Sequence, residues 1–136
     1  MRLAIAILMV LAAAPLAAKE KARFLGTGTY ATAEGCEKLK KIAAGGPKNV
    51  ETTPELLDEH GFHGWEGDCE FTKIFEHEKD KSWLGLTTCV DGATISSVTY
   101  VFIKDETSGV FEVAAQGEGA ESEQHVYSRC ETKKGN

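Results

Sequence analysis

Side chains that could bind a metal ion gather around the segment GFHGWEGDCEF, residues 61–71. Imidazole and carboxylate groups are common metal ligands, and four of them lie close together here: His60, His63, Glu66 and Asp68. In an extended strand His60 and His63 would point to opposite faces, because they are three residues apart, whereas a helical turn could bring them together. Metal or ligand binding by His60, His63 and the nearby acids is therefore one hypothesis.

A structural turn explains the same segment without a ligand, and the sequence favours this interpretation. Gly61, Gly64 and Gly67 allow backbone conformations that other residues avoid, so the chain can reverse tightly. Trp65 offers a large area to bury. We therefore predict a turn that leads into a strand, with Trp65 as a packing residue, no metal ligands and no cofactor.

Catalytic motifs are missing from the sequence. It contains neither a Gly-x-Ser-x-Gly elbow nor a glycine-rich phosphate loop between a strand and a helix. Glu118, Glu121 and Glu123 lie in a polar segment where solvation explains them, and they could act as acid and base only if burial separated their pKa values. We predict no catalytic residues, and an enzyme is the third hypothesis.

The N-terminal segment MRLAIAILMVLAAAPLAAKE has the pattern of a secretory signal peptide. Arg2 precedes an apolar run that is shorter than the roughly 20 residues that span a bilayer. We expect cleavage after Ala18, which leaves residues 19–136 as a single domain in the periplasm or outside the cell. The sequence predicts no membrane span.

Net charge argues against two classes of partner. Without Arg2 the chain has 14 of its 15 basic residues and all 21 acidic ones, a formal charge of −7. Nucleic acid and anionic membranes both require concentrated positive charge, so we predict no nucleic-acid partner. The one basic cluster, Lys38, Lys40 and Lys41, shares a predicted helix with Glu37 and is typical of a solvated face.

Four cysteines, at positions 36, 69, 89 and 130, indicate two disulfides in an exported chain of this size. Zinc sites use pairs with short spacings, whereas these cysteines are 33, 20 and 41 positions apart. The segment 69–90 predicts a hairpin about Lys79. That register places Phe75 opposite Trp83 and Cys69 opposite Cys89, with Thr72 and Ile74 facing Leu84 and Leu86.

The expected disulfides are therefore Cys69 to Cys89 and Cys36 to Cys130. The main alternative is Cys36 to Cys69 with Cys89 to Cys130, because the register could slip by one residue.

The remaining pattern predicts a mainly β domain with one helix. We expect a strand over 24–31, a helix from Cys36 that ends near Gly45, and strands at 95–104, 110–113 and 125–130. Residues 53–61 favour a short helix slightly over an extended segment, because Thr53 and Pro54 form a helix start. Four or five antiparallel strands in meander order would form a small sheet or partly closed barrel, with the helix over a face or an end.

These features in this order, GFHGWEGDCEF, Trp83 shortly before Cys89, and a final VYSRC, resemble small exported bacterial proteins of unknown function. The resemblance covers most of the chain after the signal peptide and implies a mainly β domain with two disulfides, without a known activity. More remotely, the size and meander are similar to periplasmic barrels that inhibit lysozyme or proteases. The serine, glycine and tyrosine signatures of the lysozyme inhibitors are missing, so that similarity concerns architecture alone.

Together these observations predict a non-catalytic exported protein that acts by binding a protein or the cell envelope. The expected contact regions are the acidic loop from Gln116 to Gln124 and the exposed edge of the sheet. The partner, the oligomeric state and the choice between periplasm and external medium stay open.

Overall fold

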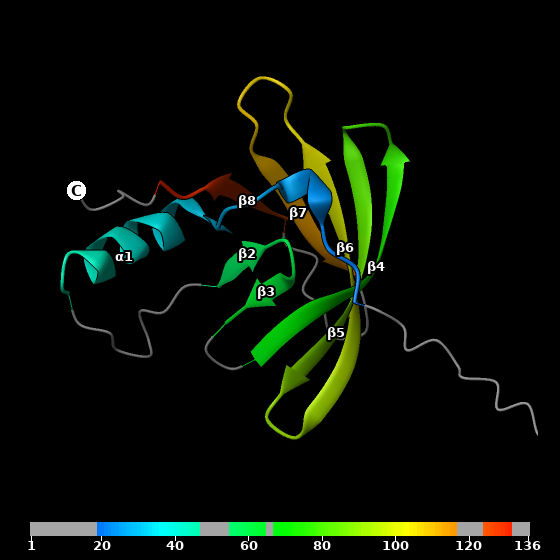
Figure 1. The fold of residues 1–136 in the computed structure, drawn as a ribbon, viewed down its shortest axis with the longest axis horizontal. Helices are drawn as coiled ribbons and strands as arrows, with labels where there is room; N and C mark the ends of the chain where they lie inside the picture. The colour runs from blue at the N-terminus through cyan, green and yellow to red at the C-terminus, as the bar shows by residue number, and fades with distance from the viewer. Residues whose placement is uncertain (1–18, 47–54, 65–66, 117–123, 132–136) are drawn as a thin grey trace, which may run out of the picture.

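A computed structural model describes residues 19–46, 55–64, 67–116 and 124–131. Eight antiparallel strands in chain order form a closed barrel, and β8 pairs with β1 (Figure 1). The strands are β1 (Tyr30–Ala31), β2 (Leu56–Asp58), β3 (Gly61–His63), β4 (Gly67–Glu78), β5 (Ser82–Asp91), β6 (Thr94–Lys104), β7 (Phe111–Gln116) and β8 (Gln124–Arg129). The mainly β class and the meander order are confirmed, and the described residues contain one α-helix as predicted. The expected number of four or five strands is wrong, because eight strands form the barrel.

The N-terminal part of the chain contains more short elements than the sequence predicts. The expected strand over 24–31 is wrong for its first half, because a 3-10 helix η1 (Arg23–Leu25) precedes β1. The helix favoured over 53–61 is also wrong, since the described part of that range is β2 followed by the start of β3; Thr53 and Pro54 lie outside the described residues. Strands of two or three residues show no alternation that a sequence pattern could reveal.

Helix α1 (Ala33–Ala43) lies outside the barrel beside β1 and β8 (Figure 1). It begins after Thr32, whose Oγ1 accepts a hydrogen bond from the N–H of Gly35 at 3.2 Å, and it ends before Gly45, which has φ of +88°. Cys36 packs against Ala31 at the helix base. The predicted helix is thus confirmed, although it begins three residues earlier.

Both disulfides join the predicted cysteines. Cys36 bonds to Cys130, tying α1 to the end of β8, with Cα atoms 5.2 Å apart. Cys69 bonds to Cys89 across the β4–β5 ladder. No free cysteine is left, and the alternative pairing is excluded.

The β4–β5 register is correct at the disulfide, wrong by one residue from Lys73 to Glu76, and wrong by two at Glu78, because the register shifts again between Glu76 and Glu78. A bulge between Phe71 and Lys73 adds one residue to β4, so Phe75 lies opposite Leu84 while Trp83 lies opposite Glu76. Phe75 is therefore on the outside of the barrel, and Trp83 is buried inside it. The expected contact of Thr72 and Ile74 with Leu84 and Leu86 is likewise wrong, because Ile74 pairs with Gly85.

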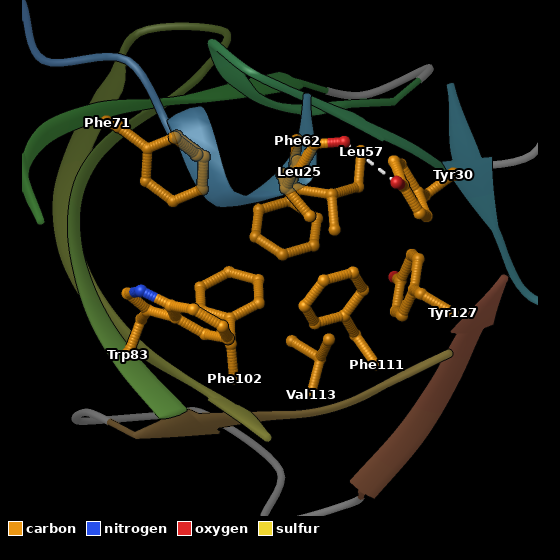
Figure 2. Close-up of a cluster of buried hydrophobic side chains, with 11 residues drawn as sticks. Leu25, Tyr30, Leu57, Phe62, Phe71, Trp83, Phe102, Phe111, Val113 and Tyr127 are labelled. Carbon is orange, nitrogen blue, oxygen red and sulfur yellow. Dashed lines mark hydrogen bonds between the residues drawn. The ribbon is translucent and has the colours of Figure 1, made fainter. Parts of the chain in front are cut away.

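Aromatic side chains fill the barrel. Figure 2 shows them pointing inward from β3, β4, β5, β6 and β7, with Leu25 of η1 inserted above them. Phe62, Phe71, Phe102 and Phe111 are at most 2% exposed. An added Cβ at Gly85 would lie 2.7 Å from the Phe71 ring, so glycine makes room for the ring there. An eight-stranded barrel is just wide enough for such side chains.

Candidate functional site

The segment GFHGWEGDCEF forms the β3–β4 hairpin, as the structural interpretation predicts. The N–H of Gly64 donates to the carbonyl of Gly67 at 3.0 Å and closes the turn. Gly61 has φ of +149°, and a Cβ there would lie only 1.9 Å from the carbonyl oxygen of Cys69. The glycine thus lets the two strands approach closely. Trp65 and Glu66 lie outside the described residues, so the expected packing of Trp65 stays a prediction.

His63 lies between two carboxylates. Its Nδ1 is 3.1 Å from an oxygen of Asp68, and its Nε2 is 3.1 Å from an oxygen of Asp58. Partial burial alone would lower the pKa of His63, but the hydrogen bonds and charges of Asp58 and Asp68 outweigh it and raise the pKa. Asp58 also accepts the backbone N–H of His60, and these contacts lower its pKa despite burial.

These contacts differ from the predicted ligand set. The structure brings His63 and Asp68 together, but the ring of His60 lies against Glu59, with Nε2 3.3 Å from its carboxylate. Asp58 was not among the predicted ligands; the signal for it was an aspartate directly before a turn, where its side chain accepts the backbone N–H groups of His60 and Gly61. Among the described residues no group of three or more His, Cys, Asp or Glu side chains is arranged to hold a metal ion.

Inside the barrel, the described polar groups satisfy one another. Thr87 is buried and donates to the carbonyl of Val98 at 2.9 Å. No buried nitrogen or oxygen atom of a described side chain lacks a hydrogen-bond partner. The Tyr127 hydroxyl donates to Glu55 at 2.7 Å. Burial, reinforced by the Glu55 charge, raises the pKa of Tyr127, so this hydroxyl is protonated at neutral pH. The candidate binding features of the described barrel therefore lie on its surface.

Large apolar side chains gather on the outside of β4, β5 and β6. Phe75, Leu84 and Val101 are consecutive partners across the three strands, and Leu86 and Ile103 extend this row along β5 and β6. Exposure of the larger members is between 36% for Leu84 and 48% for Phe75. We call Phe75, Leu84, Leu86, Val101 and Ile103 the outer face. Its signal in the sequence was the run WLGL, which lacks the polar alternation of a half-exposed strand.

A groove of about 910 Å³ lies beside the outer half of β4. One wall is the N-terminal segment 19–22, which we call the strap, and the floor includes Phe24, Ile74 and Trp83. Phe24 stacks on Trp83 with ring centroids 4.3 Å apart. A carboxylate oxygen of Glu20 in the strap accepts hydrogen bonds from Lys73 Nζ at 3.0 Å and from the backbone N–H of Ile74 at 3.3 Å. The Lys73 contact, opposed by slight desolvation, lowers the pKa of Glu20.

Other predicted contact regions fall outside the site or outside the described residues. Residues 117–123 of the acidic loop are not described, including Glu118, Glu121 and Glu123. The lysines of α1 form ion pairs with acids on the same helix, Lys38 with Glu34 and Lys40 with Glu37, as a solvated face requires. In the part of the chain that the structure describes, no helix combines the length and apolar character needed to cross a membrane.

The strap, the groove and the outer face are therefore the features from which a function can be argued. Comparison of the chain with models of protein families, with curated proteins and with solved structures finds no significant match.

Proposed function

We propose that this chain is an exported, non-catalytic protein that binds another protein through the outer face. The observation that carries the proposal is the row of apolar side chains across three long strands, exposed at Phe75, Leu84, Leu86 and Ile103 and partly buried at Val101, in a barrel whose interior is already filled. Contiguous exposed apolar surface is uncommon on small domains and marks interaction sites. The rigid, disulfide-braced ladder beneath it holds these side chains in fixed positions.

The arrangement of the outer face also suits a protein partner. Phe75 lies next to Lys73, whose Nζ is 5.9 Å from the centre of the Phe75 ring. An apolar centre beside charged groups is the usual composition of protein interfaces, in which a few aromatic and aliphatic side chains supply most of the affinity.

The experiment is affinity capture from an envelope extract of the source organism. Leu84→Ser with Leu86→Ser should reduce recovery of a specific partner by at least about tenfold, since two central apolar contacts are lost. The matched control is Val126→Ser, which removes an exposed apolar side chain from β8, outside the outer face. Equal recovery with both variants, each folded by near-ultraviolet circular dichroism, would contradict the proposal.

A second arm tests the acidic loop, the other contact region that the sequence suggests. Replacement of residues 117–123 by a glycine–serine linker should leave recovery unchanged if the outer face binds the partner. Loss of the partner in this variant alone would transfer the function to the loop.

Export is the other half of the proposal. Two disulfides fit a compartment outside the reducing cytoplasm, and the sequence of residues 1–18 has the pattern of a signal peptide. Mass spectrometry of the protein isolated from its source should find a chain that begins close to Lys19. An intact N-terminus in the cytoplasm would overturn this half.

The competing hypothesis is a small metal or ligand carrier that uses His60, His63 and nearby acids. It has less support because Asp58 and Asp68 approach His63 from its two ring nitrogens, so one ion cannot bind both carboxylates and the ring together. Metal analysis of protein purified without a histidine tag separates the hypotheses. A stoichiometric transition metal would favour the carrier.

A further inference from the structure

We propose that the outer half of β4 binds an extended peptide segment of the partner by strand addition, and that this segment has an acidic residue two positions from an apolar one. The inference rests on the proposed function, because it names how part of the partner binds next to the outer face. Strand addition gives affinity through main-chain hydrogen bonds and specificity through alternate side chains.

The backbone of β4 is available for this pairing. Strand β3 ends at His63 and pairs only with residues 68–70 of β4, so residues 73–78 pair with β5 on one side only. Figure 1 shows β4 running well past β3, with the N-terminal segment beside its outer half. We call residues 73–78 the free edge.

The orientation of the free edge follows from one hydrogen bond. The N–H of Ile74 donates to Glu20 and not to β5, so Ile74 and, two residues later, Glu76 direct their N–H and C=O groups away from β5. Among the described residues, neither the carbonyl of Ile74 nor the N–H of Glu76 pairs with another strand. The carbonyl of Ile74 and the N–H of Glu76 therefore supply one acceptor and one donor with which an added strand could pair.

The strap already imitates a bound peptide. A peptide carbonyl would take the place of the Glu20 carboxylate at the N–H of Ile74, and an acidic side chain would replace the same carboxylate at Lys73. Glu20 is held at the edge by its side chain, through Ile74 and Lys73, whereas Ala22 is buried in the core and donates its N–H to the Glu59 carbonyl at 2.7 Å. A peptide that makes several hydrogen bonds can therefore displace Glu20 while Ala22 stays in place. Lys73, which loses the Glu20 carboxylate, then requires a new acidic partner.

Side-chain positions along the added strand define the rest of the pattern. Lys73 and Phe75 both lie on the outside of the barrel, two residues apart. A partner acid beside Lys73 therefore places the residue two positions away beside Phe75, where an apolar side chain extends the outer face. The residue between them points inward, over Phe24 and Trp83 in the groove. The regular part of the free edge, residues 73–76, spans about 13 Å, because the β4–β5 register shifts again between Glu76 and Glu78.

A different protein suits this edge better than a second copy of the chain. Two copies of β4 related by a two-fold axis can pair antiparallel with residue 74 or 75 at the axis. In these registers Lys73 would lie opposite Phe75 or His77, respectively. Neither of them supplies the carboxylate that Lys73 has in the free protein, so charge complementarity favours a partner with its own acid.

The test uses a phage-displayed library of random eight-residue peptides, selected on the oxidised chain 19–136. Enriched peptides should share the acid and apolar pair, and synthetic versions should bind with measurable affinity by fluorescence anisotropy. Glu76→Pro removes an edge-facing N–H, together with the carboxylate that accepts the Asp80 N–H at 2.8 Å. It should weaken binding at least about tenfold, because a proline at an edge leaves the β5 ladder intact, and the Glu76→Ala control loses the same carboxylate. Glu76→Ala, which keeps the N–H, should bind within about twofold of wild type.

Two further measurements keep the proposal falsifiable if the proline variant misfolds. Peptide binding to wild type should slow amide exchange at Glu76, and Lys73→Glu should change the selected peptides from acidic to basic at that position. Lack of enrichment, binding unaffected by Glu76→Pro, or no exchange protection would overturn strand addition. A dimer in sedimentation velocity that Glu76→Pro abolishes would assign the edge to a second copy and also overturn it.

The two proposals can fail separately. If capture of the partner is lost with Leu84→Ser and Leu86→Ser but is unchanged with Glu76→Pro, the outer face binds and strand addition is wrong. If the outer-face variants have no effect on capture, the proposed function fails whatever the peptides show.

Discussion

Strand β4 is paired differently along its two halves. Residues 67–71 lie between β3 and β5, where Cys69 is bonded to Cys89 and opposite Phe62. Beyond the bulge, residues 73–78 have β5 on one side and the strap on the other. One continuous strand thus passes from a fully paired ladder to a free edge, and the change occurs within two residues.

The difference places the features that stabilise β4 in one half of the strand and an unpaired backbone edge in the other. The paired half is fixed by a backbone approach at Gly61 and by a covalent bond, and both would be costly to change. The free edge is covered by the first two residues of the strap, through ion pairs of Lys19 with Glu70 and Glu20 with Lys73. Exposed ion pairs contribute little to stability, so Lys19 and Glu20 can leave the edge without unfolding the barrel. Ala22 stays buried in the core and anchors the other end of the strap.

The largest expected effect is in the paired half, at Gly61. Gly61→Ala should lower the free energy of unfolding by about 4 kcal/mol, above the usual cost of overpacking, because its Cβ would meet the Cys69 carbonyl. Gly92→Ala is the matched control, with φ of +55° and nothing within 4 Å of the added Cβ. It should cost about 1 kcal/mol. Urea unfolding measures both losses. Equal losses of unfolding free energy in Gly61→Ala and Gly92→Ala would contradict a close approach of β3 and β4 at Gly61.

The second effect is the disulfide of the paired half. Cys69→Ala with Cys89→Ala should lower the free energy of unfolding by about 3 kcal/mol, since the bond closes a loop with a sequence separation of 20 residues. Urea unfolding under non-reducing conditions measures the loss. Before the variants are compared, non-reducing peptide mapping of the unsubstituted protein, with cleavage after Lys73, Lys79 or Lys81, should recover Cys69 linked to Cys89. A fragment with Cys69 joined to Cys36 would contradict the structure.

A smaller, local effect is expected at the free edge. Glu20→Gln should increase the amide exchange rate of Ile74 by roughly fivefold, because a neutral amide is a weaker acceptor than the carboxylate. The amide of Phe75 supplies an internal control. Its backbone N–H points toward β5, so its exchange rate should not change. NMR measures both exchange rates. An unchanged rate at Ile74, or an equal increase at Ile74 and Phe75, would contradict the contact between Glu20 and Ile74.

The smallest effect is a pH dependence at the start of the paired half. The pKa of His63 is raised in the folded state, so its ion pairs stabilise the fold fully below the unfolded pKa of about 6.5. This contribution is lost as the pH rises through the folded pKa. The loss should be well under 1 kcal/mol, because the side chain is 36% exposed. Urea unfolding between about pH 6 and pH 8 measures it.

Two variants complete the pH experiment. His63→Gln should abolish the dependence, and Asp68→Asn should reduce it by removing one of the two carboxylates. A dependence that persists in His63→Gln would have another origin.

The sequence predicted the long elements and failed on the short ones. Helix α1 and strands β6 and β8 were correct because each has a sustained apolar pattern. Thr53 and Pro54 predict a helix start just before β2, yet Leu57 in β2 is fully buried opposite Phe62. A three-residue strand is stable only beside its neighbours, so its own residues do not reveal it.

The candidate site was predicted only in part. The sheet edge was expected as a contact region, and the structure leaves residues 73–78 of β4 unpaired on one side, although the barrel itself is closed. The outer face was missed because a hairpin without a bulge puts Phe75 opposite Trp83. The contact between Glu20 and Ile74 joins residues 54 positions apart, and no local pattern contains it.

By itself the sequence determined the mainly β class, the meander order and the presence of two disulfides, because alternation, turn residues and the number of cysteines can be read locally. The tertiary structure decided between the two cysteine pairings. It also decided that the sheet closes into a barrel and that the bulge at Thr72 turns Phe75 outward and Trp83 inward. Closure depends on pairing between β1 and β8, about 100 residues apart. A one-residue bulge reverses the side chains that follow it up to the next register shift, and its position is selected by how the aromatic core packs.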